Sequence, residues 1–173
     1  MIDYRIKAEG KFNGSLGELV SMLEHVRSVT LQEISDLEEE ELDYLPYEKA
    51  NSIGALLWHI AAVEFVHQIV SFEDRDLTDD EYEKWRVPLE LGDKARETIR
   101  NKPLSYYINE LAQVRKKTLA VLTEKDKEWL LKEKTWDNGV AHNNYYLWFH
   151  VLEDEISHRG QIRMIKRQME EEC

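Results

Sequence analysis

Two polar residues interrupt the apolar face of the last long helical pattern in the chain. Asp154 and His158 are four residues apart, so in a helix they lie one turn apart on the same face. A buried carboxylate without a partner is costly, so Asp154 needs a partner, and His158 is within its reach. The other positions of this stripe are aliphatic: Leu147, Val151, Ile162 and Ile165.

A second helical pattern, residues 52–72, carries the same kind of interruption at His59. If the two helices pack against each other, His59, Asp154 and His158 meet between them. Two imidazoles and one carboxylate form a ligand set for zinc, nickel, manganese or iron, with positions left open for water or substrate. A hydrogen-bonded ion pair without metal also explains the three residues, and the pattern alone leaves both interpretations open. The stripe around His59 is otherwise aliphatic: Leu56, Val63, Val66 and Val70.

The first two of four long helical patterns have recognisable starts. Residues 15–37 open with Ser15 and Glu18, which have the spacing of a capping box. The pattern over residues 52–72 begins near Ser52 and is apolar on most sides, which predicts the most buried helix of the fold.

The other two long patterns lie in the second half of the chain, and no strand is predicted. The third follows Pro103, with Ser105 as its expected cap, and the fourth spans Asn144–Met169. Residues 73–92 are acidic and irregular, which predicts a loop with a short turn. Residues 93–101 predict a short helix, and residues 125–144 a polar connection.

Length and composition define the fold class. The chain has 173 residues but only 7 Gly and 3 Pro, too few for a turn-rich β-sandwich or barrel. Together with the helical patterns, this predicts an all-α protein, a four-helix bundle with long crossover loops that forms a single domain over residues 1–173.

Charge and hydropathy argue against two classes of partner. The net charge of −12 gives no basic footprint for nucleic acid. No apolar run approaches the roughly 20 residues of a membrane span, and the N-terminus lacks the pattern of a signal peptide. The only cysteine is Cys173, so no internal disulfide is expected and a reducing compartment fits. These features predict a cytoplasmic protein with no membrane partner.

Two segments resemble the DinB/YfiT-like family of four-helix-bundle proteins. They are WHIAAVE at residues 58–64 and YYLWFHVLEDEISHRGQI at residues 145–162, and the likeness extends from about Phe12 to Arg167. That family holds a metal ion with three histidines, one from the second helix and two from the last. The resemblance therefore implies His59 and His158 as ligands. The middle position is Asp154, where the family usually has histidine.

The resemblance also implies a function. Family members with an assigned activity are metal-dependent thiol transferases or hydrolases that act on small molecules, and the resemblance implies a homodimer. We therefore expect a divalent metal, a small-molecule substrate and a homodimer. The alternative is a non-catalytic helical dimerisation module with a degenerate metal site, or a metal-binding sensor or store without turnover.

The other histidines are expected to lie outside the ligand set. His150 precedes His158 by about 12 Å of helix, so the two do not share one ion. His150 is expected beside the ligands or at the mouth of a cavity, or simply as a partly buried residue at the helix start. His67 is expected outside the site, and His25 and His142 at the surface.

Several neighbours of these residues also carry expectations. Glu64, Glu153 and Glu155 are candidates for a general base, with solvent-facing charge as the default interpretation. Gly160 costs about 1 kcal/mol relative to Ala inside a helix, which predicts close approach of a neighbouring helix. Gln161 is expected at the surface, or bound to a carbonyl group at a helix end or in a dimer partner.

Overall fold

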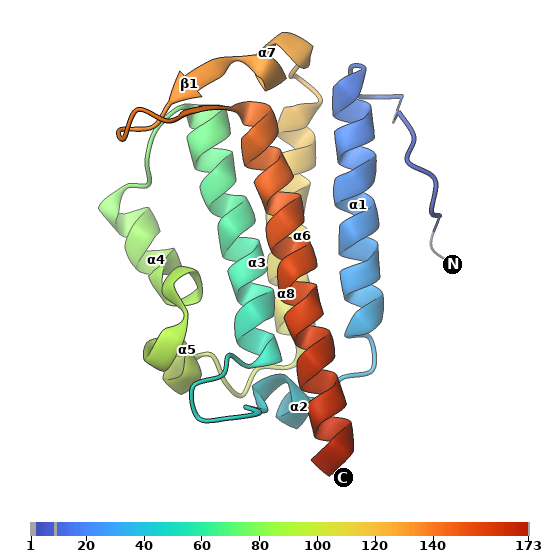
Figure 1. The fold of residues 1–173 in the computed structure, drawn as a ribbon, viewed down its shortest axis with the longest axis vertical. Coiled ribbons are helices and arrows are strands. Elements are labelled where there is room, and N and C mark those ends of the chain that lie inside the picture. Colours follow the sequence, from blue (N-terminus) through green and yellow to red (C-terminus); the bar gives the residue numbers. More distant parts are fainter. Residues whose placement is uncertain (1–2, 9, 173) are drawn as a thin grey trace.

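Four long helices form the body of the protein. The computed structural model describes residues 3–8 and 10–172. Helices α1 (Ser15–Glu33) and α8 (Asn144–Glu172) run in one direction, and α3 (Ile53–Gln68) and α6 (Leu104–Leu122) run in the other (Figure 1). The predicted all-α four-helix bundle is confirmed.

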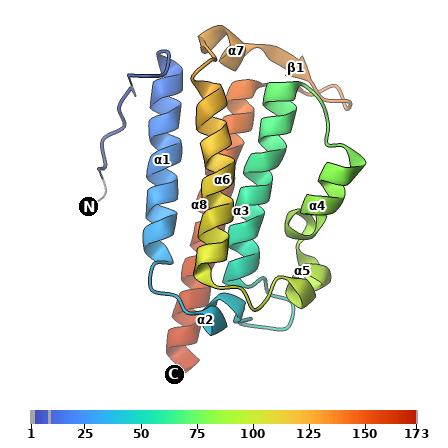
Figure 2. The same ribbon diagram turned by 180° about the vertical axis from the view of Figure 1, so that it is seen from behind.

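Short elements connect the long helices at the two ends and along one side of the bundle (Figures 1 and 2). At one end, α2 (Glu39–Asp43) links α1 to α3. The π-helical turn η1 (Ile69–Glu73) continues α3, and α4 (Asp79–Glu90) and α5 (Gly92–Thr98) then lead to α6. At the other end, α7 (Lys127–Leu131) and the strands β1 (Glu133–Thr135) and β2 (Ala141–Asn143) lead to α8.

Helix α3 is the most buried of the long helices, as its composition predicts. The hydroxyl of Ser52 caps it by accepting a hydrogen bond from the backbone nitrogen of Ala55 at 3.2 Å. The expectation that no apolar run approaches the length of a membrane span was wrong, because Ile53–Glu73 is long and apolar enough to cross one, as the one such helical stretch within the described part of the chain. Of its most apolar stretch, 61% is buried inside the bundle. Its hydropathy is therefore that of a core helix.

The ends of the other helices differ from the prediction. The residue that caps α1 is Gly14, with φ 48°, and no side chain caps this helix, so Ser15 and Glu18 form no capping box. Helix α6 begins directly after Pro103 without a side-chain cap, which leaves Ser105 inside its first turn. Helix α1 ends at Glu33, although the side chain of Leu37 is still buried. The apolar pattern of residues 15–37 therefore marks buried positions, and these continue past the last residue of α1.

The prediction of a loop over residues 73–92 was wrong, because residues 79–90 form α4. Thr78 and Glu81 make a reciprocal capping box, and the acidic first turn suits the positive end of the helix dipole. The ring of Trp85 stacks on Phe65 of α3, with centroids 4.9 Å apart, and this contact fixes α4 against the bundle. The acidic residues mark a helix start and not a loop.

The absence of strands was also wrongly predicted. Strands β1 and β2 pair antiparallel, with Glu133 opposite Asn143 and Thr135 opposite Ala141. Gly139 in the connecting turn has φ 83°, a conformation that glycine adopts without strain. Each strand has three residues, too few to show an alternating pattern in the sequence.

A network of ion pairs crosses the centre of the bundle and joins its four long helices. Arg27 of α1 donates to Glu64 of α3 and to Glu155 of α8, each at 3.0 Å. Arg115 of α6 donates to Glu64 at 2.8 Å, and the hydroxyl of Thr118 donates to the same carboxylate at 2.7 Å. The interpretation of Glu64 and Glu155 as solvent-facing charges was therefore wrong, because both carboxylates are buried.

The two arginines keep Glu64 ionised inside the core. Burial alone raises the pKa of this carboxyl, but the charges of Arg115 and Arg27 outweigh burial and lower its pKa to about 2. Both carboxylates are neutralised by arginine, so neither is available as a general base.

Close helix packing involves a different glycine from the one predicted. A Cβ atom on Gly160 would meet nothing within 4 Å, and Gly160 is exposed, so it serves no close approach within this chain. A Cβ atom on Gly54 would lie 2.5 Å from the hydroxyl oxygen of Tyr107. Gly54 is therefore the glycine that lets α3 and α6 pack closely.

Candidate metal centre

Helices α3 and α8 bring the three predicted ligand residues together. One ligand atom each from His59, Asp154 and His158 lies within 4.8 Å of the other two. The Oδ1 atom of Asp154 is 3.2 Å from Nε2 of His158 and 3.7 Å from Nε2 of His59. The two imidazole rings are nearly perpendicular, with centroids 4.7 Å apart. We call these three residues the triad.

A backbone carbonyl fixes the tautomer of His59. Its Nδ1 atom lies 2.7 Å from the carbonyl oxygen of Pro88 in α4. Only a protonated ring nitrogen can donate to a carbonyl, so Nδ1 carries a proton, and in the neutral ring Nε2 presents a lone pair toward Asp154. Metal-binding histidines are held in this way by a partner on the far ring nitrogen.

Gln161 holds the second histidine of the triad. Its side-chain amide nitrogen donates to Nδ1 of His158 at 3.2 Å, so the proton of this ring lies on Nε2, next to Asp154. An ion bound to Nε2 requires that proton to move to Nδ1 and the Gln161 amide to present its oxygen. Gln161 is exposed, as expected, but it contacts a ring nitrogen of His158 and not a carbonyl group.

The carboxylate of Asp154 has an orphaned oxygen. Oδ1 faces both histidines, whereas Oδ2 is buried and has no hydrogen-bond partner among the residues that the structure describes. Burial raises the pKa of Asp154, but the hydrogen bond with His158 and the neighbouring imidazole of His59 outweigh burial and hold this pKa well below its usual range. A buried, ionised and incompletely paired carboxylate fits a cation.

His59 responds to the same charge. Burial lowers its pKa, but the neighbouring carboxylate of Asp154 and the hydrogen bond with the Pro88 carbonyl raise it above its ordinary value. In the absence of an ion, a proton therefore helps to hold the triad together. A metal ion and this proton compete for the same lone pair.

A second pair of histidines lies on the same face of the bundle. The ring of His67 in α3 and that of His150 in α8 have centroids 5.4 Å apart. His67 donates from Nδ1 to the carbonyl oxygen of Val63 at 2.7 Å. His150 lies 3.2 Å from the carboxylate of Glu153, which is exposed as expected. His67 was expected outside the ligand set, and in the structure it lies beside His150 and not among the three residues of the triad.

The remaining two histidines are half buried and not at the open surface. His25 packs edge-on to Tyr4, with ring centroids 5.6 Å apart. His142 stacks on Trp136 across the hairpin, with centroids 3.6 Å apart. Aromatic neighbours therefore account for both positions.

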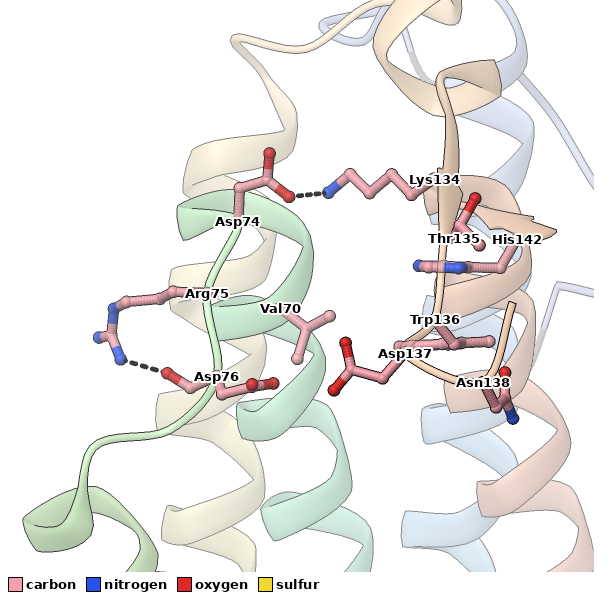
Figure 3. Close-up of a pocket in the computed structure, with 10 residues that line it drawn as sticks. All are labelled: Val70, Asp74, Arg75, Asp76, Lys134, Thr135, Trp136, Asp137, Asn138 and His142. Atoms are coloured by element: carbon pink, nitrogen blue, oxygen red, sulfur yellow. Dashed lines mark hydrogen bonds and ion pairs between the residues drawn. The ribbon is translucent and has the colours of Figure 1, made fainter. Parts of the chain in front are cut away.

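A polar hollow of about 790 Å³ lies between the hairpin and the loop after η1 (Figure 3). Lys134 reaches across it to Asp74 at 2.7 Å, and Asp137 points toward Val70. Val70 lies roughly 16 Å along the helix from His59, at a rise of about 1.5 Å per residue. The hollow is therefore separate from the triad and nearer to the His67–His150 pair.

Comparison with known proteins identifies relatives. The family model described as mycothiol-S-transferase matches residues 18–171. The crystal structure of a conserved protein from Enterococcus faecalis is similar to this chain, with a TM-score of 0.63 and 17% sequence identity. The match covers 87% of this chain and 94% of that one, and it shows the fold. No curated protein matches the chain.

Proposed function

Because the chain belongs to the mycothiol-S-transferase family, we propose that it transfers a small thiol to an electrophilic small molecule with the help of a divalent metal ion. The family model covers most of the chain, and the predicted likeness to DinB/YfiT-like proteins is confirmed. The observation that carries the metal-dependent part is the convergence of His59, Asp154 and His158 from two helices.

The triad fits a divalent ion in both geometry and charge. The three ligand atoms lie close enough for small side-chain movements to bring each to about 2 Å from a shared ion. The orphaned oxygen of Asp154 gains a partner when a cation binds. The hydrogen bond from His59 to Pro88 already presents the correct ring nitrogen, which lowers the cost of ordering this ligand.

The composition of the ligand set favours an anionic substrate group. Two neutral imidazoles and one carboxylate leave a net positive charge on a divalent ion. When bound, the ion supplies charge that lowers the pKa of a neighbouring thiol and stabilises the thiolate. The three protein ligands leave at least one coordination position open in tetrahedral geometry.

The protein contributes a partly buried setting for this charge. The side chains of His59 and His158 are each 14% exposed and that of Asp154 is 12% exposed, so the triad is shielded from most bulk water without being fully buried. Helix α4 covers one side through Pro88 and is fixed by Trp85. Electrostatic attraction between the site and a thiolate is stronger in such a setting than in open water.

Thiol transfer tests the proposal directly. Purified protein is loaded with zinc, and mycothiol, glutathione or cysteine is offered together with 1-chloro-2,4-dinitrobenzene. We expect thioether formation with at least one thiol, inhibition by a chelator, and recovery when zinc is added back. The variants His59→Ala and Asp154→Ala should lose the activity, whereas the control His142→Ala should keep it.

A metal-free result selects the alternative function. If the protein takes up no zinc, nickel, manganese or iron, and no thiol reacts faster than without protein, the triad is a buried hydrogen-bond cluster in a non-catalytic module. Metal uptake without thiol transfer indicates a sensor or store.

A further inference from the structure

The His67–His150 pair lies on the same seam between α3 and α8 as the triad. His67 follows His59 by about 12 Å of helix, and His150 precedes Asp154 by about 6 Å. The two helices run in opposite directions, so both displacements are toward the end of the bundle that carries the hairpin (Figure 1). The pair therefore forms a second layer of imidazoles between the triad and the polar hollow.

The backbone fixes the tautomer of His67. Its Nδ1 atom lies 2.7 Å from the carbonyl oxygen of Val63, so Nδ1 carries the proton. The lone pair of Nε2 makes no hydrogen bond or ion pair with the part of the chain that the structure describes. His67 is half buried, and its free ring nitrogen is thus a proton acceptor without an assigned partner.

The surroundings of His67 keep it neutral. Burial lowers its pKa, and the neighbouring His150 lowers it further. The hydrogen bond with Val63 and the charges of Asp154 and Glu64 act in the opposite direction, but the pKa stays below its ordinary value. Near pH 7 the ring is a free base, ready to accept a proton.

The other basic groups near this seam are already engaged. His59 and His158 face Asp154 within the triad. The buried carboxylates of Glu64 and Glu155 are paired with arginines. Among the described residues, Nε2 has no partner in either His67 or His150, but His150 pairs through Nδ1 with Glu153 and its side chain is 41% exposed, so His67 is the more deeply buried of the two.

We propose that His67 is the general base of the transfer reaction and that its Nε2 atom accepts the proton of the incoming thiol. This role rests on the proposed function. His150, whose side chain is 41% exposed, links the pair to Glu153 and to solvent, and it provides the exit for the proton.

The proposed step balances in protons and electrons. The S–H proton moves to Nε2 of His67, and the sulfur keeps the electron pair. The sulfur then forms a bond to the electrophilic carbon, while the bond to the leaving group breaks and the leaving group takes its electron pair. The imidazolium of His67 passes its proton to the leaving group, or through His150 to solvent, and returns to the neutral form.

The test uses a variant that preserves the structural contact. In His67→Asn the side-chain amide takes the place of Nδ1–H and can still donate to Val63, but no basic nitrogen remains. We expect unchanged zinc content, a fall in kcat of about 10²–10⁴-fold, and loss of the acid limb of the pH–rate profile. His67→Gln serves as a second variant if the first one unfolds, and His142→Asn is the matched control.

A second readout does not depend on activity. Long-range ¹H–¹⁵N NMR spectra of the histidine rings should show His67 as the neutral Nδ1–H tautomer at pH 7. A protonated ring, or an Nε2–H tautomer, overturns the proposal.

The kinetic outcomes separate the two proposals. An active wild-type protein whose rate and pH profile are unchanged by His67→Asn overturns the role of His67 alone. A zinc-loaded wild-type protein that transfers none of the thiols removes the proposed function, and the role of His67 with it.

Discussion

The Nδ1 atom of His59 lies 2.7 Å from the carbonyl oxygen of Pro88, and this contact sets which ring nitrogen of His59 faces Asp154. Helix α4 therefore acts on the triad without providing a ligand. Partners of this kind commonly change metal affinity by 10–100-fold.

Loosening α4 should weaken metal binding while leaving the ligands in place. Trp85 stacks on Phe65, so Trp85→Ala removes the contact that fixes α4 against α3. We expect the Kd for zinc, measured by competition with a chelating dye, to rise by about 10-fold. Trp136→Ala in the hairpin is the control and should leave the Kd unchanged. An unchanged Kd in Trp85→Ala would show that the bond to Pro88 does not tune the site.

Asp154 is the proposed ligand that departs from the histidine pattern, and two substitutions test its role. Asp154→Asn keeps the size of the side chain but removes its charge, and we expect it to lose zinc. Asp154→His restores three histidines and should bind zinc more tightly than the wild type. Isothermal titration gives both affinities. Equal affinity in all three proteins would mean that Asp154 is not a ligand.

Metal binding should weaken in acid. The pKa of His59 is raised and that of Asp154 lowered, so a falling pH protonates His59 first while Asp154 stays ionised. Zinc must displace that proton, and its affinity should decline as the pH falls through the raised pKa of His59. Zinc titrations between pH 5.5 and pH 8, buffer values chosen to bracket the ordinary histidine pKa of about 6.5, measure this decline. A flat profile contradicts it.

In the metal-free protein, the contribution of His59 to folding stability should increase as the pH falls, which is opposite to the trend expected for zinc affinity. A raised pKa in the folded state stabilises the protein below the unfolded-state pKa, and the gain is lost as the pH rises through the folded-state pKa. His59 therefore contributes more stability to the metal-free protein in mild acid than in mild base. Thermal melts of the wild type and of His59→Gln, made with a chelator in mild acid and again in mild base, isolate the contribution of His59 to the melting temperature.

Breaking the buried ion-pair network should destabilise the fold strongly. Glu64→Gln leaves Arg27 and Arg115 without their shared carboxylate charge. Removing one partner of a buried pair costs about 3–5 kcal/mol, which urea unfolding measures. Arg86→Ala removes an exposed pair with Glu83, and its effect should stay within about 1 kcal/mol. Similar losses in the two variants would show that the network contributes little.

Gly54 of α3 and Gly160 of α8 should respond differently to alanine. In Gly54→Ala the new methyl group collides with the ring of Tyr107, so we expect destabilisation. In Gly160→Ala it meets nothing within this chain, so the free energy of unfolding should rise by about 1 kcal/mol. Destabilisation by Gly160→Ala together with a change in oligomeric state would reveal a contact with a second copy.

The triad could be predicted because helical periodicity places residues directly. His59 interrupts an aliphatic stripe, and Asp154 and His158 interrupt another at one-turn spacing. The partner of His59 could not be predicted, because it is a backbone carbonyl in a segment whose acidic residues suggested a loop. Gln161 was not linked to His158 either, although its i+3 position offered a signal.

The sequence contained a signal for the buried ion-pair network, namely charged residues at apolar positions of two helices, but a charged residue is by default expected at the surface. Glu64 lies in the middle of an otherwise apolar helix, and Arg27 follows the aliphatic stripe of α1. The pairing of charges between four helices depends on tertiary packing, which no single helix encodes.

The homodimer and the cytoplasmic location stay predictions, and Cys173 lies outside the described residues.

The central claim is that His59, Asp154 and His158 hold one metal ion. Anomalous diffraction at the zinc absorption edge, from crystals grown with zinc and without an affinity tag, tests it most directly. We predict a single peak about 2 Å from Nε2 of both histidines and from the Asp154 carboxylate. The Gln161 amide should then have turned its oxygen toward Nδ1 of His158. Triad side chains still joined to one another with no peak between them would contradict the claim.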